Sequence, residues 1–369
     1  MKNVFLSFCI ATYNRKIPLK ELIDSILSLD RNDIEVVVTD NCSTDGTEEM
    51  LLSYKDRRLK YYKNQSPIAG LSNIVRSLFN ASGKYGFYIN DRDLIDVTLV
   101  NRVINVLESN CWACLELTER KRKNITNKIC CFGSGGKALC NIGLLHHPTG
   151  LVVNAELVRR NLSENDYFQY SDTYPYDFLL MDLACYGDVG NFDVGIWYQR
   201  KNFKAVNKAA SISKVSPYRL YFTPDARFET ARRLFLHVLC ENKMVLEYSN
   251  NDRYAIARHI FLVFSSALID YKGYYSNKEE CIHYGIKKKF ISYFVMKHIL
   301  YDFEKMYLEL MVNNSFNDVS IEKMNNEIYK NRKKFKKEYF RVYEYAAKRN
   351  VKKILSQIPY LNNKYKLDY

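Results

Sequence analysis

Short apolar runs and amphipathic helical patterns alternate through the first hundred residues of the chain. Residues 4–10 form an apolar run with β-branched and aromatic members, which predicts a buried strand. The next segment places Leu19, Leu22, Ile23, Ile26 and Leu27 on one helical face. By the same reasoning, further strands are predicted at residues 34–39, 59–62 and 85–89, and further helices at residues 45–52, 71–79 and 98–109.

This alternation predicts an α/β fold with a mostly parallel sheet and helices on both of its faces. After about residue 216, Pro and Gly become scarce, and long helical patterns rich in Tyr and Lys take over. We therefore expect an α/β domain over residues 1–215 and a mainly α-helical domain over residues 216–369. A chain of 369 residues with 47% hydrophobic and 26% charged residues suits two globular domains and excludes a disordered protein.

Three polar clusters follow the predicted strands of the first domain, at residues 12–15, 40–41 and 91–93. Ligands of open α/β sheets bind at the carboxyl ends of the strands, where these clusters lie. Asp91 and Asp93 could hold Mg²⁺ or Mn²⁺ together with the phosphate oxygens of a substrate. Asp40 could accept a hydrogen bond from a nucleobase. The simpler alternative for each is a solvated turn whose carboxylate binds nearby backbone amides.

The chain has ten Cys and no stretch of about 18 or more apolar residues that could cross a bilayer. Its first residues lack the apolar segment of a signal peptide. We therefore expect a cytoplasmic protein with reduced thiols. Cys111 and Cys114 form a CxxC pair, but the spacings to the later Cys residues match no common zinc motif, so we favour buried thiols over a zinc site.

Positive charge is concentrated near the end of the chain. The net charge is +14, and residues 321–369 hold 14 Lys or Arg against five Asp or Glu. Residues 332–337 are basic around Phe335, with Tyr339 following at helical spacing. This segment could rest on the anionic inner face of the plasma membrane, or it could present a solvated basic face above an aromatic core stripe. We favour the second interpretation.

Four segments in series resemble the motifs of glycosyltransferase family 2. Residues 8–15 read FCIATYNR, residues 36–47 read VVVTDNCSTDGT, residues 70–85 contain GLSN, an Arg and ASGKY, and residues 91–93 read DRD. Their order and spacing also fit the family over roughly residues 1–215. The resemblance, to members of the bacterial capsule and surface-polysaccharide type, implies the GT-A fold, a nucleotide-binding α/β domain. The family often has further acids at the fourth strand end, where this chain has Asn90 and Arg92.

The resemblance also implies roles for individual residues. Thr12 and Tyr13 would flank the nucleotide base, and Asp40 would bind uracil. Asp93 would be the main metal ligand, with Asp91 facing the ribose and the phosphates. The full set implied to bind the nucleotide sugar is Thr12, Tyr13, Arg15, Asp40, Asn73, Arg76, Asp91, Arg92 and His147.

An inverting glycosyltransferase needs a general base that takes a proton from the acceptor hydroxyl. In the family this carboxylate lies near the start of a helix in the second half of the domain. Asp177, in the segment YPYDFLLMDLACYG of residues 174–187, takes that place, with Asp172 and Asp182 as rivals. The alternative for Asp177 is a helix cap. His147, in the segment HHPTG of residues 146–150, resembles a loop that borders the sugar pocket, or it is polar surface.

The resemblance thus implies an enzyme that moves a sugar from a UDP-sugar to a hydroxyl of a glycan or lipid-linked acceptor, with Mn²⁺ or Mg²⁺ as cofactor. The sequence leaves open whether the chain forms a homodimer through its helical domain. A sugar-nucleotide nucleotidyltransferase would need a Gly-rich phosphate loop after the first strand, and residues 12–16 contain no glycine. A protein that binds nucleic acid or an anionic surface through its basic tail would leave the strand-end clusters unexplained. We therefore expect no nucleic-acid partner.

Overall fold

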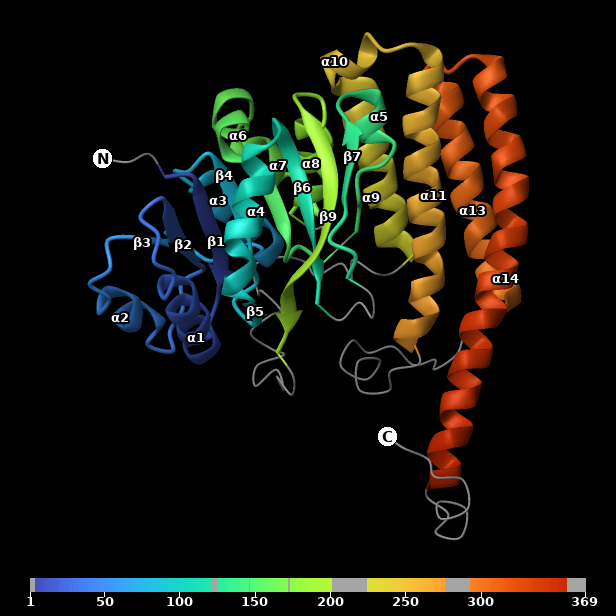
Figure 1. The fold of residues 1–369 in the computed structure, drawn as a ribbon. Helices are drawn as coiled ribbons and strands as arrows, with labels where there is room; N and C mark the ends of the chain where they lie inside the picture. The colour runs from blue at the N-terminus through green and yellow to red at the C-terminus, as the bar shows by residue number, and fades with distance from the viewer. Residues whose placement is uncertain are drawn as a thin grey trace. The chain divides into compact units, whose positions relative to one another are not determined.

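The computed structural model describes residues 4–120, 125–145, 147–171, 173–200, 224–275 and 293–356. The chain divides into two compact units (Figure 1). The first comprises the described residues of Met1–Tyr221 together with Leu234–Ile256, and the second those of Phe222–Arg233 and Ala257–Tyr369. The predicted domain boundary near residue 216 lies outside the described residues.

The first unit holds a nine-stranded mixed sheet in the order β3-β2-β1-β4-β8-β6-β9-β5, with β7 also paired to β9. Its strands are β1 (Leu6–Thr12), β2 (Ile34–Asp40), β3 (Leu59–Lys63), β4 (Tyr85–Tyr88), β5 (Asp93–Ile95), β6 (Trp112–Glu119), β7 (Ile129–Gly133), β8 (Leu151–Asn154) and β9 (Asp188–Gln199). The helices among and after them are α1 (Lys16–Leu27), α2 (Thr47–Leu52), α3 (Gly70–Phe79), α4 (Val100–Glu108), α5 (Gly136–Leu139), α6 (Ala155–Asn161), α7 (Glu164–Phe168), α8 (Pro175–Leu183) and α10 (Lys243–Leu246).

Strands β1 to β4 are parallel, as predicted, and all seven residues of β2 are buried, which is typical of a strand covered on both faces. Beyond β4 the sheet is mixed, because β6 pairs with β9 in parallel whereas the other pairs are antiparallel. Strand β8 runs antiparallel to both β4 and β6, and β5 and β7 run antiparallel to β9. These strands are short or come from the irregular stretch after residue 110, so no strand–helix alternation marked their direction.

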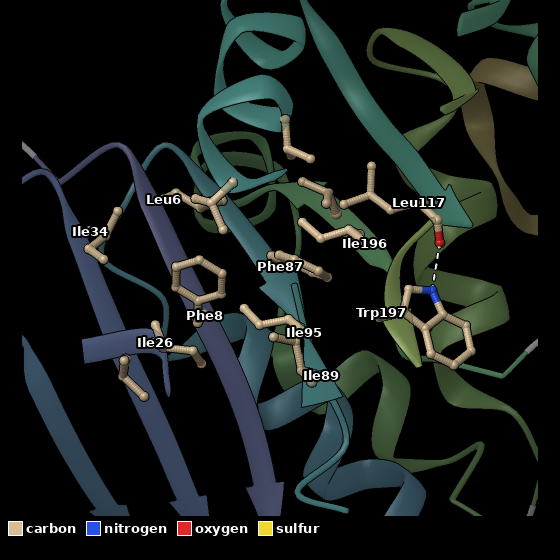
Figure 2. Packing of buried hydrophobic residues seen from close by; sticks show 14 of the residues in the cluster. Leu6, Phe8, Ile26, Ile34, Phe87, Ile89, Ile95, Leu117, Ile196 and Trp197 are labelled. Atoms are coloured by element: carbon tan, nitrogen blue, oxygen red, sulfur yellow. Dashed lines mark hydrogen bonds between the residues drawn. The ribbon is translucent and has the colours of Figure 1, made fainter. Parts of the chain in front are cut away.

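The core of the first unit lies between the sheet and α1 and α4. Figure 2 shows Phe8 and Phe87 from adjacent strands packed beside Ile95. The two phenyl rings lie 5.6 Å apart, within the range of favourable tilted pairs. At the far end, the indole of Trp197 donates a 2.8 Å hydrogen bond to the carbonyl of Leu117, which fixes the ring at the end of β9.

The second unit is helical, as predicted for the carboxyl-terminal part, and includes α13 (Tyr293–Asn313) and α14 (Asp318–Ser356). Helices α9 (Pro224–Leu236) and α11 (Asn250–Tyr275) contain the points at which the division between the units falls. On α14, Phe335 and Tyr339 are buried while the basic residues around them are exposed. The aromatic stripe is therefore buried beneath an exposed basic face, which both interpretations of this segment require.

Two further expectations concern membranes and zinc. Across the described helices, no segment combines the length and apolarity needed to span a membrane. Of the CxxC pair, Cys111 is exposed and Cys114 is buried. Within the described part of the chain, no group of three or more His, Cys, Asp or Glu side chains is placed to hold a metal ion such as zinc, whose structural sites take four protein ligands.

Candidate functional site

The site begins with Asp40, the last residue of β2, which is fully buried. Its Oδ1 accepts hydrogen bonds from the backbone N–H and the hydroxyl of Ser43, at 3.0 and 2.5 Å. Its Oδ2 accepts one from the phenol of Tyr61 at 3.2 Å. Burial and the nearby Asp40 charge raise the pKa of Tyr61, so the phenol stays a donor. The carboxylate is therefore held in one orientation at the edge where a nucleotide base is expected.

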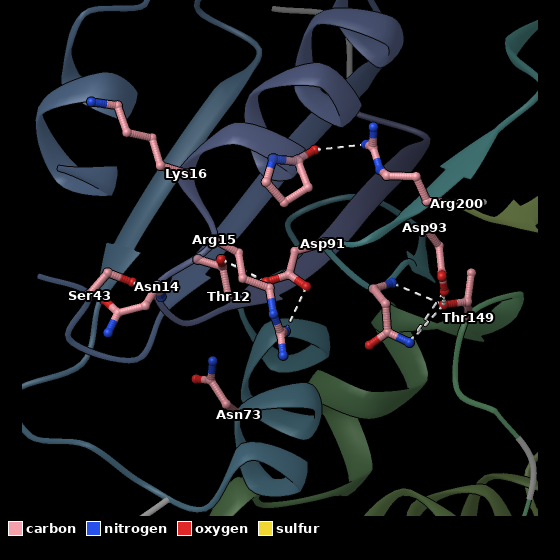
Figure 3. A network of polar contacts seen from close by, with 12 residues as sticks. Thr12, Asn14, Arg15, Lys16, Ser43, Asn73, Asp91, Asp93, Thr149 and Arg200 are labelled. Atoms are coloured by element: carbon pink, nitrogen blue, oxygen red, sulfur yellow. Dashed lines mark hydrogen bonds and ion pairs between the residues drawn. The ribbon is translucent and has the colours of Figure 1, made fainter. Parts of the chain in front are cut away.

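Asp91 lies just past the end of β4, two strands along the sheet from β2, and is also fully buried. Thr12 donates to its Oδ2 at 2.9 Å, and the guanidinium of Arg15 meets its Oδ1 at 2.9 Å (Figure 3). Burial raises the pKa of Asp91, although Arg15 opposes this effect. The structure thus brings together three predicted donor-binding residues. Tyr13 is half-buried in the same loop, between Thr12 and Arg15.

The loop after β1 is tied to the loop after β2. Asn14 adopts the left-handed backbone conformation, with φ of 52°. Its N–H donates to the hydroxyl of Ser43 at 2.8 Å, and its side-chain oxygen accepts from the N–H of Thr44 at 2.7 Å. Because Ser43 also binds Asp40, these contacts fix the two strand ends relative to each other.

Asp93 begins β5 and has different partners from Asp91, although one residue separates them. Its buried carboxylate accepts a 2.5 Å hydrogen bond from the hydroxyl of Thr149, and the amide of Asn90 lies at 3.4 Å. The Nε2 atom of His147 lies 3.7 Å away. All three of these contacts from the described residues are made with Oδ2. Arg92, between the two acids, points to solvent as an exposed side chain.

His147 packs flat on Trp197, with ring centroids 5.2 Å apart and planes inclined by 13°. Burial lowers the pKa of this imidazole, although the charge of Asp93 opposes the effect. A neutral imidazole can act as a metal ligand or as a hydrogen-bond acceptor. Its Nδ1 is buried and has no hydrogen-bond partner among the described residues. The preceding His146 lies outside those residues.

Asn73 and Arg76, both on α3, lie in a polar network behind Asp40. Asn73 donates to the backbone carbonyl of Thr39 at 3.0 Å, and its oxygen accepts from Asn64 at 2.9 Å. Arg76 pairs with Glu164 at 2.6 Å and also donates to Asn64. These contacts place both residues under the loops at the strand ends. Their direct contact with a donor stays a prediction.

Asp177 is the third residue of α8, after Pro175 at the first position, so it is not the N-cap of that helix. It is buried, and its Oδ2 accepts a 3.0 Å hydrogen bond from the backbone N–H of Leu145. Asp177 and His147 line the same pocket, which has a volume of about 40 Å³. Of its two rivals, Asp172 lies outside the described residues, and Asp182 has a different set of partners.

Asp182 is the centre of a buried polar network between α8 and the segment that precedes α10. It accepts hydrogen bonds from the phenol of Tyr167 at 2.8 Å and the amide of Asn242 at 3.0 Å. The Nε2 atom of His237 lies 2.9 and 3.0 Å from its two oxygens, and Nδ1 of the same ring lies 3.1 Å from the phenol of Tyr170. Asp182 therefore holds the helix that carries Asp177.

The His237–Asp182 pair predicts a pH dependence of stability. Burial lowers the pKa of His237, but the hydrogen bond and charge of Asp182 outweigh it, so the pKa is raised in the folded state. The stabilisation is then fully present below the unfolded pKa of about 6.5 and is lost as pH rises through the folded value. We expect His237→Gln to lower the free energy of unfolding by about 1–3 kcal/mol near pH 6, and by less near pH 9. Urea unfolding of both proteins at the two pH values measures this; an equal loss at both would contradict it.

Thr149 and Trp197 are site residues that sequence reasoning missed. Thr149 is buried, and besides donating to Asp93 it accepts from the backbone N–H of Asn90 at 3.0 Å. Gly150 follows with φ of 100°, and a Cβ there would strike the Leu117 carbonyl and the Trp197 ring. The sequence feature that could have indicated Thr149 is the Thr-Gly pair after Pro148. No local pattern marked Trp197, because its role depends on a distant loop.

Comparisons with known proteins find similarity in the first part of the chain. Residues 7–128 match the family described as glycosyl transferase family 2. The chain is 36% identical over 97 residues to the abequosyltransferase RfbV of Salmonella typhimurium, covering 25% of this chain and 29% of that protein. It is 35% identical over 91 residues to the GalNAc(5)-diNAcBac-PP-undecaprenol beta-1,3-glucosyltransferase of Campylobacter jejuni, covering 24% and 29%.

Among solved structures, S. aureus TarS 1–349 aligns with 73% of this chain and 80% of its own, at 14% identity and a TM-score of 0.49. The matched segment spans less than a third of the length of each of the two curated relatives. Residues 7–128, which match the family, contain the three strand-end clusters and end before Asp177. The similarity to glycosyl transferase family 2 thus lies in residues 7–128 of this chain.

Proposed function

We propose that the protein is an inverting, metal-assisted glycosyltransferase that moves a sugar from a nucleotide sugar, with UDP as the expected nucleotide, to a hydroxyl of a glycan or lipid-linked acceptor. The observation that carries the proposal is the position of His147. Its imidazole lies 3.7 Å from the carboxylate of Asp93 and lines the same pocket as Asp177. The imidazole of His147 is therefore near the candidate metal ligand, Asp93, and lines the same pocket as the candidate base, Asp177.

The donor would lie along the strand ends of the first unit. Asp40 would accept a hydrogen bond from the base, and Thr12, Arg15 and Asp91 form the next group along the sheet edge. The diphosphate would then approach Asp93, and the sugar would reach the pocket at His147 and Asp177. This order follows the sheet, in which β2, β1 and β4 are adjacent.

The residues around Asp93 fit a divalent cation. Thr149 and Asn90 bind Oδ2, which leaves Oδ1 of a buried carboxylate for a metal, and His147 offers a neutral nitrogen nearby. Mn²⁺ or Mg²⁺ often takes few protein ligands and completes its shell with substrate phosphates and water. Bound there, the cation would neutralise charge on the departing diphosphate.

Asp177 would take the proton from the acceptor hydroxyl as that oxygen attacks the anomeric carbon. The N–H of Leu145 holds one of its oxygens, so the carboxylate is oriented before substrate arrives. The buried network of Asp182 and His237 fixes the helix from its other end. The base thus sits on a rigid element, as an accurately placed reacting group requires.

We propose further that the acceptor is lipid-linked and that the enzyme works at the cytoplasmic face of the membrane. Two relatives are named for glucosyl transfer to undecaprenol-linked acceptors, which supports a lipid-linked acceptor here. The exposed Lys and Arg of α14 could contact an anionic membrane at its cytoplasmic face. Such a surface would bring the enzyme to a lipid-linked substrate without a membrane span. A homodimer through the helical unit remains a proposal.

The proposal is tested by hydrolysis of UDP-, GDP- and dTDP-sugars with Mn²⁺, measured as release of the nucleoside diphosphate. We expect turnover of a UDP-sugar that EDTA abolishes and that added Mn²⁺ restores. Release of UDP requires cleavage of the sugar–phosphate bond, so it distinguishes a glycosyltransferase from a nucleotidyltransferase, which converts a UDP-sugar and pyrophosphate to UTP and a sugar phosphate. No turnover and no binding of any nucleotide sugar would overturn the proposal.

Thr149 provides a test of the metal site. We expect Thr149→Val to weaken Mn²⁺ binding about 10-fold, because loss of a hydrogen bond to a metal ligand typically costs that much. Thr149→Ser keeps the hydroxyl and should bind Mn²⁺ within about twofold of the unaltered protein. Titration of Mn²⁺ followed by electron paramagnetic resonance measures both without any assay of turnover. Equal affinity in the Val and Ser variants would show that Thr149 does not orient Asp93.

A further inference from the structure

The pocket beside Asp177 has apolar walls. Leu180 of α8, Val189 of β9 and Ile142 are all buried, and each lines it. Cys114 adds a thiol that stays neutral because burial raises its pKa. The other lining residues are Glu116, Phe132, Gly143, His147, Pro148, Leu151, Tyr176, Asp177 and Gly190.

The size of the pocket limits what it can hold. Its volume of about 40 Å³ is well below the roughly 150 Å³ of a cavity that holds a benzene ring. A whole hexose ring is too large. The pocket can therefore hold one substituent of a sugar, while the ring stays outside, at its mouth.

The position of the pocket identifies which sugar is nearest. In an inverting reaction, the anomeric carbon lies between the base and the leaving diphosphate. His147 connects these two places, because it contacts Asp93 at 3.7 Å and lines the pocket with Asp177. The ring of the donor sugar would thus lie across the mouth, with a substituent directed into the pocket.

We propose that this pocket binds the acetamido group of a donor sugar, so that the substrate is the nucleotide derivative of an N-acetylamino sugar. The inference rests on the proposed function. The methyl group would contact Leu180, Val189 and Ile142, and the amide N–H has carboxylates of Glu116 and Asp177 in the same lining as acceptors. A hydroxyl in place of the acetamido group would leave the apolar wall empty. Filling or emptying such a pocket changes specificity by about 10-fold or more.

The first test compares two matched pairs of donors, UDP-GlcNAc with UDP-glucose and UDP-GalNAc with UDP-galactose, and adds GDP-fucose as a 6-deoxy donor that has a methyl group but no amide. We expect kcat/KM for hydrolysis to be at least about 10-fold higher for an acetamido donor than for its hydroxyl partner. Turnover without that preference would overturn this inference and leave the proposed function standing. A preference for GDP-fucose would also overturn it, since that donor offers a ring methyl and no amide. No turnover of any donor would instead overturn the proposed function.

The second test makes the pocket smaller by enlarging one residue of its wall. Val189→Ile adds one methyl group to the wall and should reduce the acetamido preference about 10-fold. Val152→Ile is the matched control, because Val152 is equally buried in the neighbouring part of the sheet and does not line the pocket. We expect it to keep the preference. An unchanged donor preference in a folded Val189→Ile protein, as judged by its melting temperature, would show that the pocket does not select the donor.

Discussion

Replacing Asp177 by asparagine is expected to lower kcat for sugar transfer by about 10³-fold while the KM for the nucleotide sugar changes by less than about threefold. Asparagine has the shape of aspartate, and its side-chain oxygen can still accept from the N–H of Leu145. It cannot take the proton of the attacking hydroxyl. The variant should therefore bind the donor normally and lose the bond-making step. Steady-state transfer kinetics, together with donor binding by calorimetry, separate the two effects.

Asp182→Asn is the matched control for that variant. It alters another buried carboxylate of α8, five residues further along the helix. Because Asp182 faces Tyr167 and His237, its loss should reduce stability more than the rate of transfer. Full transfer activity in Asp177→Asn would refute the base assignment. A large loss of kcat in a stably folded Asp182→Asn would point to the second carboxylate instead.

The first half of the site could be read from the sequence because its residues follow regular elements. Asp40 ends β2 and Asp91 lies just past β4, and parallel strands bring their carboxyl ends to one edge. The local sequence pattern therefore predicted both the strands and the edge of the sheet at which Asp40 and Asp91 lie. The structure adds that Arg15 pairs with Asp91, a contact across 76 residues that no local pattern could specify.

The second half of the site depends on pairing between distant segments. Asp93 owes its orientation to Thr149, which is placed by the loop before β8, and β8 pairs with β4 in a direction that the sequence does not mark. His147 is placed by the ring of Trp197 at the end of β9. The choice between Asp177 and Asp182 depends likewise on which neighbours each acid meets. Such contacts arise from the packing of the whole sheet and become visible only in three dimensions.

Asp93→Asn is expected to reduce Mn²⁺ binding and metal-dependent donor hydrolysis by about 10³-fold or more. A carboxamide is a weak ligand for a hard cation compared with a carboxylate. Its oxygen could keep the hydrogen bond from Thr149, but the negative charge that would attract the cation is lost. Without the cation, charge on the departing diphosphate is no longer neutralised. Mn²⁺ titration by electron paramagnetic resonance and the rate of nucleotide release measure the two effects separately.

Asp91→Asn supplies the comparison, because the two acids lie in the same triplet and have different partners. Arg15 and Thr12 occupy both oxygens of Asp91, so its loss should raise the KM for the nucleotide sugar and change Mn²⁺ affinity by less than about 10-fold. The comparison of Mn²⁺ affinity between Asp91→Asn and Asp93→Asn then decides whether one acid or both bind the cation. If Asp91→Asn lost as much Mn²⁺ affinity as Asp93→Asn, both acids would be ligands, and Arg15 would have to move from Asp91 when the cation binds. If neither variant changed Mn²⁺ affinity, the metal site at Asp93 would be wrong.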